Sequence, residues 1–403
     1  MNKQEFRTIL EFIRSLYPGE DPVPLHAPRF LGNEKKYLAE CIDSTYVSYV
    51  GRFVSDFEDH VKTLTGAREA VAIVNGTAAL QMVLQAAGVN AGDEVVTQTL
   101  TFAATAAGIR HAGAVPAFVD VDRDSLGMSP ESLRSYLEAN GKREADGLHN
   151  RRSGRRIAAI LPMHTFGHPA RIEELVDLSA EFGVQLIEDA AESLGSTYRG
   201  RHMGRFGRAA ILSFNGNKPV TTGGGGMVIT DDAELAVRVR HISTTAKRKH
   251  AWEFFHDEVG YNLRLPNVNA AIGCAQMEYF ESTIRNKRET AELYGAFFDS
   301  IGLPFVREGS ESRANYWLNA VVFKDRAERE DFLELSNRSG VQTRPVWTLM
   351  HRLPPYASCP RGQVPNAEWL EDRIVNIPSS VRTGGPVRRH REDAPLPLQR
   401  LRG

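Results

Sequence analysis

The sequence predicts an α/β protein, with a large domain built on a mainly parallel sheet and a smaller α+β domain at the C-terminal end. Short apolar runs alternate with helix-forming segments between about residues 70 and 242, a pattern typical of a parallel sheet. From about residue 267 a long amphipathic stretch replaces that alternation. The 403 residues also exceed the roughly 250 to 300 at which one hydrophobic core stops growing, so a second domain is expected.

The order of elements divides the chain into four parts. Residues 1–45 hold a helix with apolar side chains at helical spacing, a Pro-rich connection and a second helix that ends near Asp43. We expect the large domain over residues 46–265 and the small domain over residues 266–380. Residues 381–403 combine Pro, Gly and Arg without periodicity, which predicts a flexible tail.

Strands and helices are expected to alternate through the large domain. The apolar run AVAIVN stops at Gly76, as a buried strand before a turn would. The further predicted strands are DEVVTQ, VPAFVDVD, IAAILPM, VQLIED, AAILSF and GMVIT. In the small domain a long helix over residues 267–298 precedes the strand WLNAVVF, the helix DFLELSNRSG and the strand VQTRPVW.

Charge and cysteine content exclude several classes of protein. Lys and Arg number 49 against 50 Asp and Glu, so no overall basic field exists to attract nucleic acid or a membrane. Three scattered cysteines support neither a disulfide framework nor a zinc site, and they suit a reducing, cytoplasmic compartment. His164 and His168 have a spacing that suits a metal on a helix, but Gly167 and Pro169 favour a loop, so no metal is expected.

Four features follow predicted strands, at the edge where open α/β sheets bind ligands. The turn Asn75-Gly76-Thr77-Ala78 opens a helix, whose free N–H groups suit a phosphate or simply a helix cap. Phe102 follows the next strand and is placed to stack on a flat ring or to join the core.

The other two features carry ionisable groups. The strand VQLIED ends on Glu188 and Asp189, and a buried carboxylate there needs a partner such as a pyridinium nitrogen. Lys218 lies on a tight turn between two strands, before four glycines, although most lysines occupy solvated faces. Partial desolvation would lower its pKa and free the amine to attack a carbonyl.

The motifs NGTAAL, TFAATA, EDAAES, SFNGNK with its glycines, and GYNLRLPNVNAAIG resemble those of the DegT/StrS-type sugar-nucleotide aminotransferases, in family order over residues 20–380. The segments PLHAPRFLGNEKKYL, PMHTFGHPARI and NAEWLEDRIVNIPSS are most similar to the branch that serves the bacillosamine and legionaminic acid pathways. The resemblance implies the fold type I of pyridoxal-phosphate-dependent transferases, which is aspartate aminotransferase-like.

The resemblance also implies the cofactor contacts. Lys218 would form the Schiff base with pyridoxal 5'-phosphate, Asp189 would pair with its ring nitrogen, and Phe102 would lie against the ring. The phosphate of the cofactor would be bound by Gly76, Thr77, Ala78 and Ser213, and by Asn262 from the other subunit of a homodimer. Glu192 would face the phenolic oxygen, where many relatives have Gln or His, so its protonation state is an open question.

The implied reaction is transfer of an amino group from L-glutamate to C4 of a UDP- or GDP-linked 4-keto-6-deoxy hexose, expected to be a 2-acetamido sugar, in surface-glycan or nonulosonic acid biosynthesis. Candidate substrate residues are Arg264, Asn319 and Arg344. A dehydratase on the same scaffold is an alternative, although the known branch has His where this chain has Lys218. A non-catalytic regulatory relative is a second alternative, whereas the absence of a Gly-x-Gly-x-x-Gly turn argues against a nicotinamide oxidoreductase.

Overall fold

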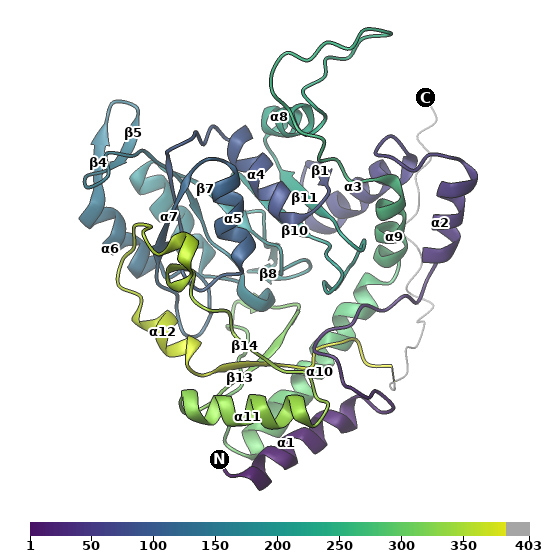
Figure 1. Ribbon diagram of the computed structural model, residues 1–403, viewed down its shortest axis with the longest axis vertical. Coiled ribbons are helices and arrows are strands. Elements are labelled where there is room, and N and C mark those ends of the chain that lie inside the picture. The colour runs from purple at the N-terminus through teal and green to yellow at the C-terminus, as the bar shows by residue number, and fades with distance from the viewer. Residues whose placement is uncertain (384–403) are drawn as a thin grey trace.

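The computed structural model describes residues 1–383, and a seven-stranded sheet forms its centre (Figure 1). Strands β7 and β10 pair in parallel near the middle of this sheet, and β11 is antiparallel to both of its neighbours. The spatial order is β1 (Glu69–Ile73), β11 (Gly226–Thr230), β10 (Ala209–Ser213), β7 (Gln185–Asp189), β6 (Ile157–Leu161), β2 (Glu94–Gln98) and β3 (Val115–Val119). The predicted α/β class with a mainly parallel sheet is confirmed.

Helices cover both faces of this sheet, which explains why its strands are apolar throughout. Successive residues of β10 show the two-sided burial, since Ile211 packs in the core on one face and Leu212 in the core on the other. The first face carries α4 (Gly76–Ala86), α5 (Ala103–His111) and α8 (Ala233–Ser243). The second carries α3 (Arg52–Thr65), α6 (Pro130–Asn140), α7 (Ile172–Phe182) and α9 (Asn267–Met277).

A second, antiparallel sheet forms the small domain, in the order β13 (Asn319–Val322), β15 (Ile374–Ile377) and β14 (Arg344–Pro345). Three helices share one hydrophobic core with this sheet: α1 (Lys3–Leu16), α10 (Phe280–Ser300) and α11 (Arg326–Arg338). The N-terminal helix is therefore part of the small domain (Figure 1). The last helix, α12 (Pro365–Glu371), packs beside β15 in a neighbouring cluster.

Two small sheets, one further helix and three 3₁₀ turns complete the part of the chain that the structure describes. The polar segment near residues 140–156 folds as the hairpin β4 (Gly141–Glu144) and β5 (Gly147–Asn150). A small sheet joins β8 (Thr197–Tyr198), β9 (Arg201–His202) and β12 (Ser312–Arg313). The remaining elements are α2 (Glu34–Asp43) and the 3₁₀ turns η1 (Thr165–Gly167), η2 (Met350–Arg352) and η3 (Pro354–Tyr356).

Two sequence predictions about the chain after residue 266 need correction. The single long helix is two helices, α9 and α10, because Tyr279 leaves helical geometry with φ −126°. Its hydroxyl contacts the Arg29 carbonyl at 3.0 Å and so ties the break to the N-terminal connection. The apolar side of α9 packs against α3 and β10, and this helix belongs to the large-domain core, not to the small domain.

The predicted tail, residues 381–403, lies mostly outside the described residues. Its first residues are anchored, since the Val381 carbonyl accepts a hydrogen bond from Arg29 and the Arg382 N–H donates to Asn286. Cys41, Cys274 and Cys359 are free and buried. None of the helices that the structure describes has the length and apolar character needed to cross a bilayer.

Candidate active site

The features that follow the predicted strands meet at one edge of the central sheet. Ile211 of β10 lies opposite Asp189 in the register, so the ends of β7 and β10 are adjacent. Helix α4 starts beside them, because a Cβ on Gly76 would lie 3.4 Å from the Cβ of Ser213. The strand ends that the sequence singled out therefore lie close together in the structure.

Lys218 lies in the turn after β10 with its amine buried. Its Nζ is 3.4 Å from Oε1 of Glu192 and 3.5 Å from the centre of the Trp317 ring. Burial lowers the pKa of Lys218, and the negative charges of Glu192 and Asp189 oppose that shift. The pocket thus brings the amine closer to its neutral, nucleophilic form than a solvated lysine would be.

Asp189 is a buried carboxylate fixed by two hydrogen bonds. Its Oδ2 accepts from the Thr105 hydroxyl at 2.7 Å, and its Oδ1 accepts from the Ala191 N–H at 3.2 Å. Burial raises the pKa of Asp189, and the bond from Thr105 is the first of the effects that oppose it. The described residues give this carboxylate no ion-pair partner, so a protonated ring nitrogen fits the position chemically.

The N-terminus of α4 offers donors for a phosphate beside the Ser213 hydroxyl. The N–H groups of Gly76 and Thr77 open the helix and have no intrahelical acceptor. The Ala78 N–H donates to Oδ1 of Asn75 at 2.8 Å as a helix cap, and the phosphate contact of Ala78 stays a prediction. Residue 226 must be glycine, because a Cβ there would lie 2.4 Å from the carbonyl carbon of Asn75.

The loop around η1 is built to hold Glu192. Oε2 of Glu192 accepts a hydrogen bond from the Phe166 N–H at 2.8 Å, and Phe166 adopts a left-handed φ of 57°. Asn315 donates to the Glu192 carbonyl at 2.8 Å and approaches so closely that a Cβ at position 167 would overlap its amide. Burial raises the pKa of Glu192 to about 7. The carboxyl group is therefore partly protonated near neutral pH.

Phe102 and Asn262 occupy positions open to contacts from outside the chain's own core. Phe102 precedes the first turn of α5, and half of its surface is exposed, with Trp347 as an aromatic neighbour at 5.8 Å between ring centres. Asn262 is exposed on the strand-like segment that pairs with Thr244. Their roles as ring-stacking and partner-subunit residues remain predictions.

The three candidate substrate residues lie on separate segments of the chain, and each side chain makes a hydrogen bond within the protein. Arg264 is buried and donates to Glu58 at 2.7 Å and to the Ala72 carbonyl at 2.9 Å. Asn319 is buried in β13, and Arg344 is exposed on β14, where it donates to the Asn337 side chain at 2.9 Å. The substrate role assigned to Arg264 is corrected, because its guanidinium neutralises an interior carboxylate.

The sequence did not predict the contacts that four side chains make at the site or behind it. Thr105 and Trp317, which contact Asp189 and Lys218, come from α5 and from the small domain. His164 and Glu188 form a buried pair at 3.1 Å behind the site, and Glu188 also accepts from the N–H groups of residues 204, 206 and 207. Only the position of Thr105, one helical turn into TFAAT, offered a local signal.

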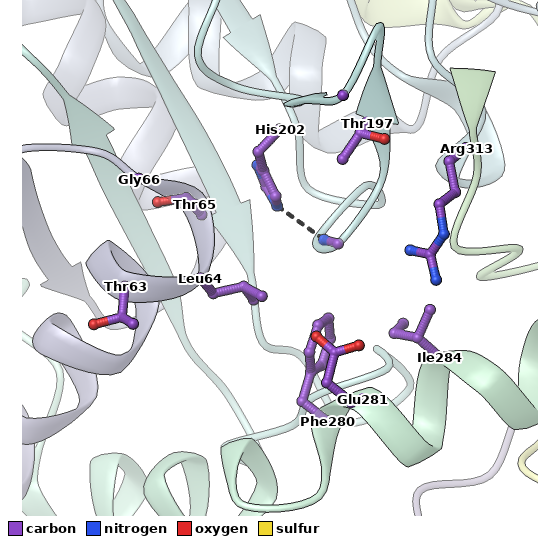
Figure 2. A pocket seen from close by; sticks show the side chains of 12 residues that line it. Thr63, Leu64, Thr65, Gly66, Thr197, His202, Phe280, Glu281, Ile284 and Arg313 are labelled. Atoms are coloured by element: carbon purple, nitrogen blue, oxygen red, sulfur yellow. Dashed lines mark hydrogen bonds between the residues drawn. The ribbon is translucent and has the colours of Figure 1, made fainter. Parts of the chain in front are cut away.

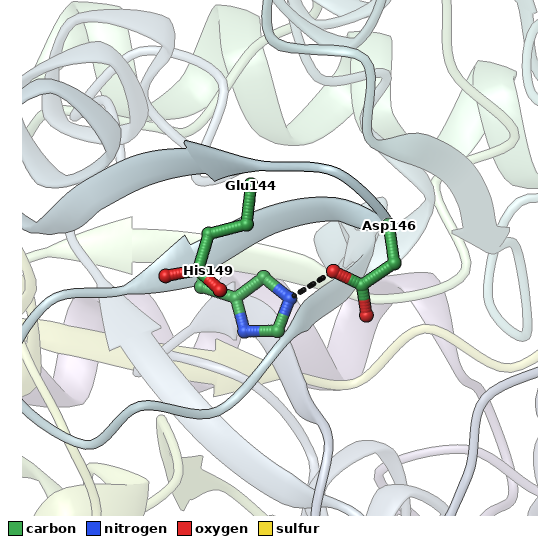
Figure 3. Close-up of side chains that lie close together, drawn as sticks. All are labelled: Glu144, Asp146 and His149. Carbon is green, nitrogen blue, oxygen red and sulfur yellow. Dashed lines mark hydrogen bonds and ion pairs between the residues drawn. The ribbon is translucent and has the colours of Figure 1, made fainter.

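Two other features of the surface lie away from these residues. A pocket of about 340 Å³ lies between the end of α3 and the β8–β9 hairpin, and Figure 2 shows the side chains that line it. His202 accepts there from the Gly195 N–H at 2.9 Å. Figure 3 shows Glu144, Asp146 and His149 together on the β4–β5 hairpin. Both ring nitrogens of His149 already bond, to Asp146 and to the Gly154 carbonyl, so this exposed cluster has a structural explanation.

Comparisons with known proteins show the family to which the chain is similar. A model of the DegT/DnrJ/EryC1/StrS aminotransferase family matches residues 30–386. GDP-perosamine synthase of Escherichia coli O157:H7 is 35% identical over 357 residues, which cover 89% of this chain and 93% of that protein. EpsN of Bacillus subtilis (strain 168), whose name assigns it to the pyridoxal phosphate-dependent aminotransferases, is 34% identical over 82% of each chain. Among solved structures, DesI in the presence of its TDP-sugar product has a TM-score of 0.77 at 28% identity and covers 91% of both chains.

Proposed function

The chain belongs to the DegT/DnrJ/EryC1/StrS aminotransferase family, and from that premise we propose that it transfers an amino group from L-glutamate to C4 of a UDP- or GDP-linked 4-keto-6-deoxy hexose, a 2-acetamido sugar. As a member, it is a pyridoxal-phosphate-dependent sugar-nucleotide aminotransferase. The observation that carries the proposal is the buried Lys218 amine. It lies 3.4 Å from Glu192, and the negative charge of Asp189 also acts on its pKa. The dehydratase alternative is disfavoured, because a lysine stands at position 218.

Pyridoxal phosphate, when bound, supplies an electron sink that stabilises negative charge on the substrate carbon. The Asp189 carboxylate would hold a proton on the ring nitrogen, and the Thr105 hydroxyl would keep that carboxylate oriented. Gly76, Thr77 and Ser213 would bind the phosphate. The Lys218 amine would remove a proton from the substrate carbon and return it, a role that its lowered pKa favours.

Trp317 and Phe102 would shape the remaining walls of the site. The Trp317 ring covers the Lys218 amine and is fixed by a hydrogen bond from its Nε1 to the Asn217 carbonyl at 2.7 Å. That cover excludes water from one side of the amine and keeps it partly desolvated. The half-exposed Phe102 is free to stack on the cofactor ring.

A homodimer is part of the proposal. Two groups of apolar side chains are exposed on the single chain, and a second copy is the partner that would bury them. The first group is Tyr46, Val47, Tyr49 and Val50, and the second is Trp252, Phe254, Phe255 and Val259. Asn262, which is exposed close in sequence to the second group, would reach the phosphate of the other subunit.

Mixing two inactive variants tests this arrangement. Lys218→Ala and Asn262→Ala, unfolded and refolded together in equal amounts, would form hybrid dimers that each hold one intact site. Half of the dimers are hybrids, so the mixture would recover about one quarter of the wild-type activity. A mixture as inactive as its parents would refute the shared site.

The acceptor is tested with the purified protein, L-glutamate and a panel of UDP- and GDP-linked 4-keto-6-deoxy sugars, with the amino sugar detected by mass. The names of the relatives that contain GDP-perosamine support a nucleotide-linked sugar of this kind. In a separate test, borohydride should fix pyridoxal phosphate covalently to the wild type and not to Lys218→Ala. A wild type that gives no adduct would contradict the role of Lys218. The bacillosamine and legionaminic acid pathway and the cytoplasmic location remain predictions.

A further inference from the structure

Lys287 on α10 is a buried amine that the proposed reaction does not use. It is 1% exposed, and its Nζ contacts the Ser379 carbonyl at 2.6 Å, the Trp317 carbonyl at 3.1 Å and Nε2 of His26 at 3.0 Å. None of the described carboxylates forms an ion pair with it. Burial lowers the pKa of Lys287 to about 7, and in the ammonium form its three N–H groups match these three acceptors.

The contact with Lys287 decides where His26 carries its proton. The ammonium form of Lys287 only donates, so in that form Nε2 of His26 accepts and the ring proton is on Nδ1. Burial, together with the charges of Lys287 and Lys218, keeps the pKa of His26 well below its ordinary value, so the ring is neutral. Nδ1 is buried and finds no hydrogen-bond partner among residues 1–383. His26 therefore presents a donor that lacks an acceptor.

This donor lies next to the candidate active site. Trp317 connects the two places, because its carbonyl accepts from Lys287 and its ring lies 3.5 Å from Nζ of Lys218. The N-terminal connection that carries His26 is held there by the Ala27 N–H, which donates to the Ser380 hydroxyl at 2.8 Å. A chain of direct contacts thus runs from His26 through Lys287 and Trp317 to the reactive amine.

We propose that Nδ1–H of His26, with the Lys287 ammonium behind it, binds an anionic oxygen of a substrate, and this inference rests on the proposed function. Both substrates of that function carry such oxygens, as the carboxylates of glutamate and the diphosphate of the sugar nucleotide. A donor next to the ammonium form of Lys287 favours an anion over a neutral oxygen. Arg264, the candidate cation that the sequence suggested, is committed to Glu58.

Two substitutions at position 26 separate this role from a structural one. His26→Gln places an amide oxygen where Nε2 was, so Lys287 keeps its acceptor and the Nδ1 donor is lost. His26→Asn places an amide N–H near Nδ1, so the donor is kept and Lys287 loses its acceptor. Substrate binding predicts that Gln is the damaging change, whereas support of Lys287 alone predicts that Asn is.

The holoenzyme is titrated with UDP and GDP by calorimetry, and its absorbance change is followed with L-glutamate to give a saturation constant and a limiting rate. His26→Gln should weaken one of these interactions about tenfold to a hundredfold, the range for a hydrogen bond to a charged group. His26→Asn should stay within about threefold of wild type, since it keeps that bond. A glutamate effect in the saturation constant identifies a carboxylate as the bound group, and a nucleotide effect identifies the diphosphate.

Wild-type binding in both arms for His26→Gln, or a larger loss for His26→Asn, would overturn the inference and leave the proposed function intact. A wild type that responds to neither glutamate nor nucleotide would instead refute the proposed function and the inference with it. Urea unfolding of both variants shows whether either change acts through the fold.

Discussion

Thr105→Val should destabilise the protein by an amount that depends on pH. The substitution keeps the shape of the side chain and removes the hydroxyl that donates to Asp189 at 2.7 Å. A hydrogen bond to an ionised carboxylate contributes about 1.5 to 3 kcal/mol, and one to a neutral carboxyl about 0.5 to 1.5 kcal/mol. The loss should therefore be about 1 kcal/mol larger where Asp189 is ionised than where it is protonated.

The sign follows from the pKa of Asp189, which burial raises in the folded protein. A raised folded pKa gives stability that is present below the unfolded value and is lost as pH rises through the folded value. Removing the Thr105 hydroxyl raises that pKa further, so the extra cost appears as pH increases and disappears toward acid.

Urea unfolding of the cofactor-free protein between pH 4.5 and 8, at a fixed protein concentration, measures this cost. Thr101→Val is the matched control, because Thr101 contacts the Thr105 hydroxyl at 2.6 Å but not Asp189. Its cost should be nearly independent of pH. A Thr105→Val cost that is constant over the range, or a control that shows the same slope, would refute the reasoning.

Three further predictions follow from single contacts. Gly226→Ala should weaken binding of pyridoxal phosphate, measured by equilibrium dialysis, and lower the unfolding free energy, measured with urea. Gly224→Ala is the control and should change neither by much, because its Cβ would meet only ordinary contacts. Equal effects of the two substitutions would contradict this prediction. Stability should fall as pH drops from 6.5 toward 4, because burial lowers the pKa of His168 to about 4 and the unfolded histidine binds its proton first. This effect lowers the unfolding free energy by up to about 3 kcal/mol. His168→Phe should remove it from the pH profile of stability. Glu192→Gln removes a negative charge that raises the pKa of Lys218, so the covalent adduct with pyridoxal phosphate should form at lower pH than in wild type. An unchanged pH profile of the absorbance spectrum would argue against the contact between Lys218 and Glu192.

Local patterns predicted the strand ends and the ionisable groups on them. Asp189 and Lys218 were identifiable because each interrupts an apolar or glycine-rich run with a charge that is costly to bury. Their supporting contacts come from distant parts of the chain, and no periodicity encodes them. Trp317 reaches Lys218 from the small domain, and the partner of Arg264 is Glu58, 206 positions earlier. A guanidinium near a cofactor motif therefore looked like a substrate contact when it is half of an interior ion pair.

The distribution of charge explains how one buried pocket can hold both a base and an acid near neutral pH. Lys218 faces two carboxyl groups, and burial lowers the pKa of the amine while it raises those of Asp189 and Glu192. A cationic ring nitrogen against Asp189 would pair with that carboxylate and leave Glu192 as the acidic neighbour of the amine. Burial raises the pKa of Glu192 to about 7 and lowers that of Lys218, so the two values lie closer together than those of the free groups. We therefore expect the carboxyl group that seemed unsuited to this position to exchange a proton with the lysine.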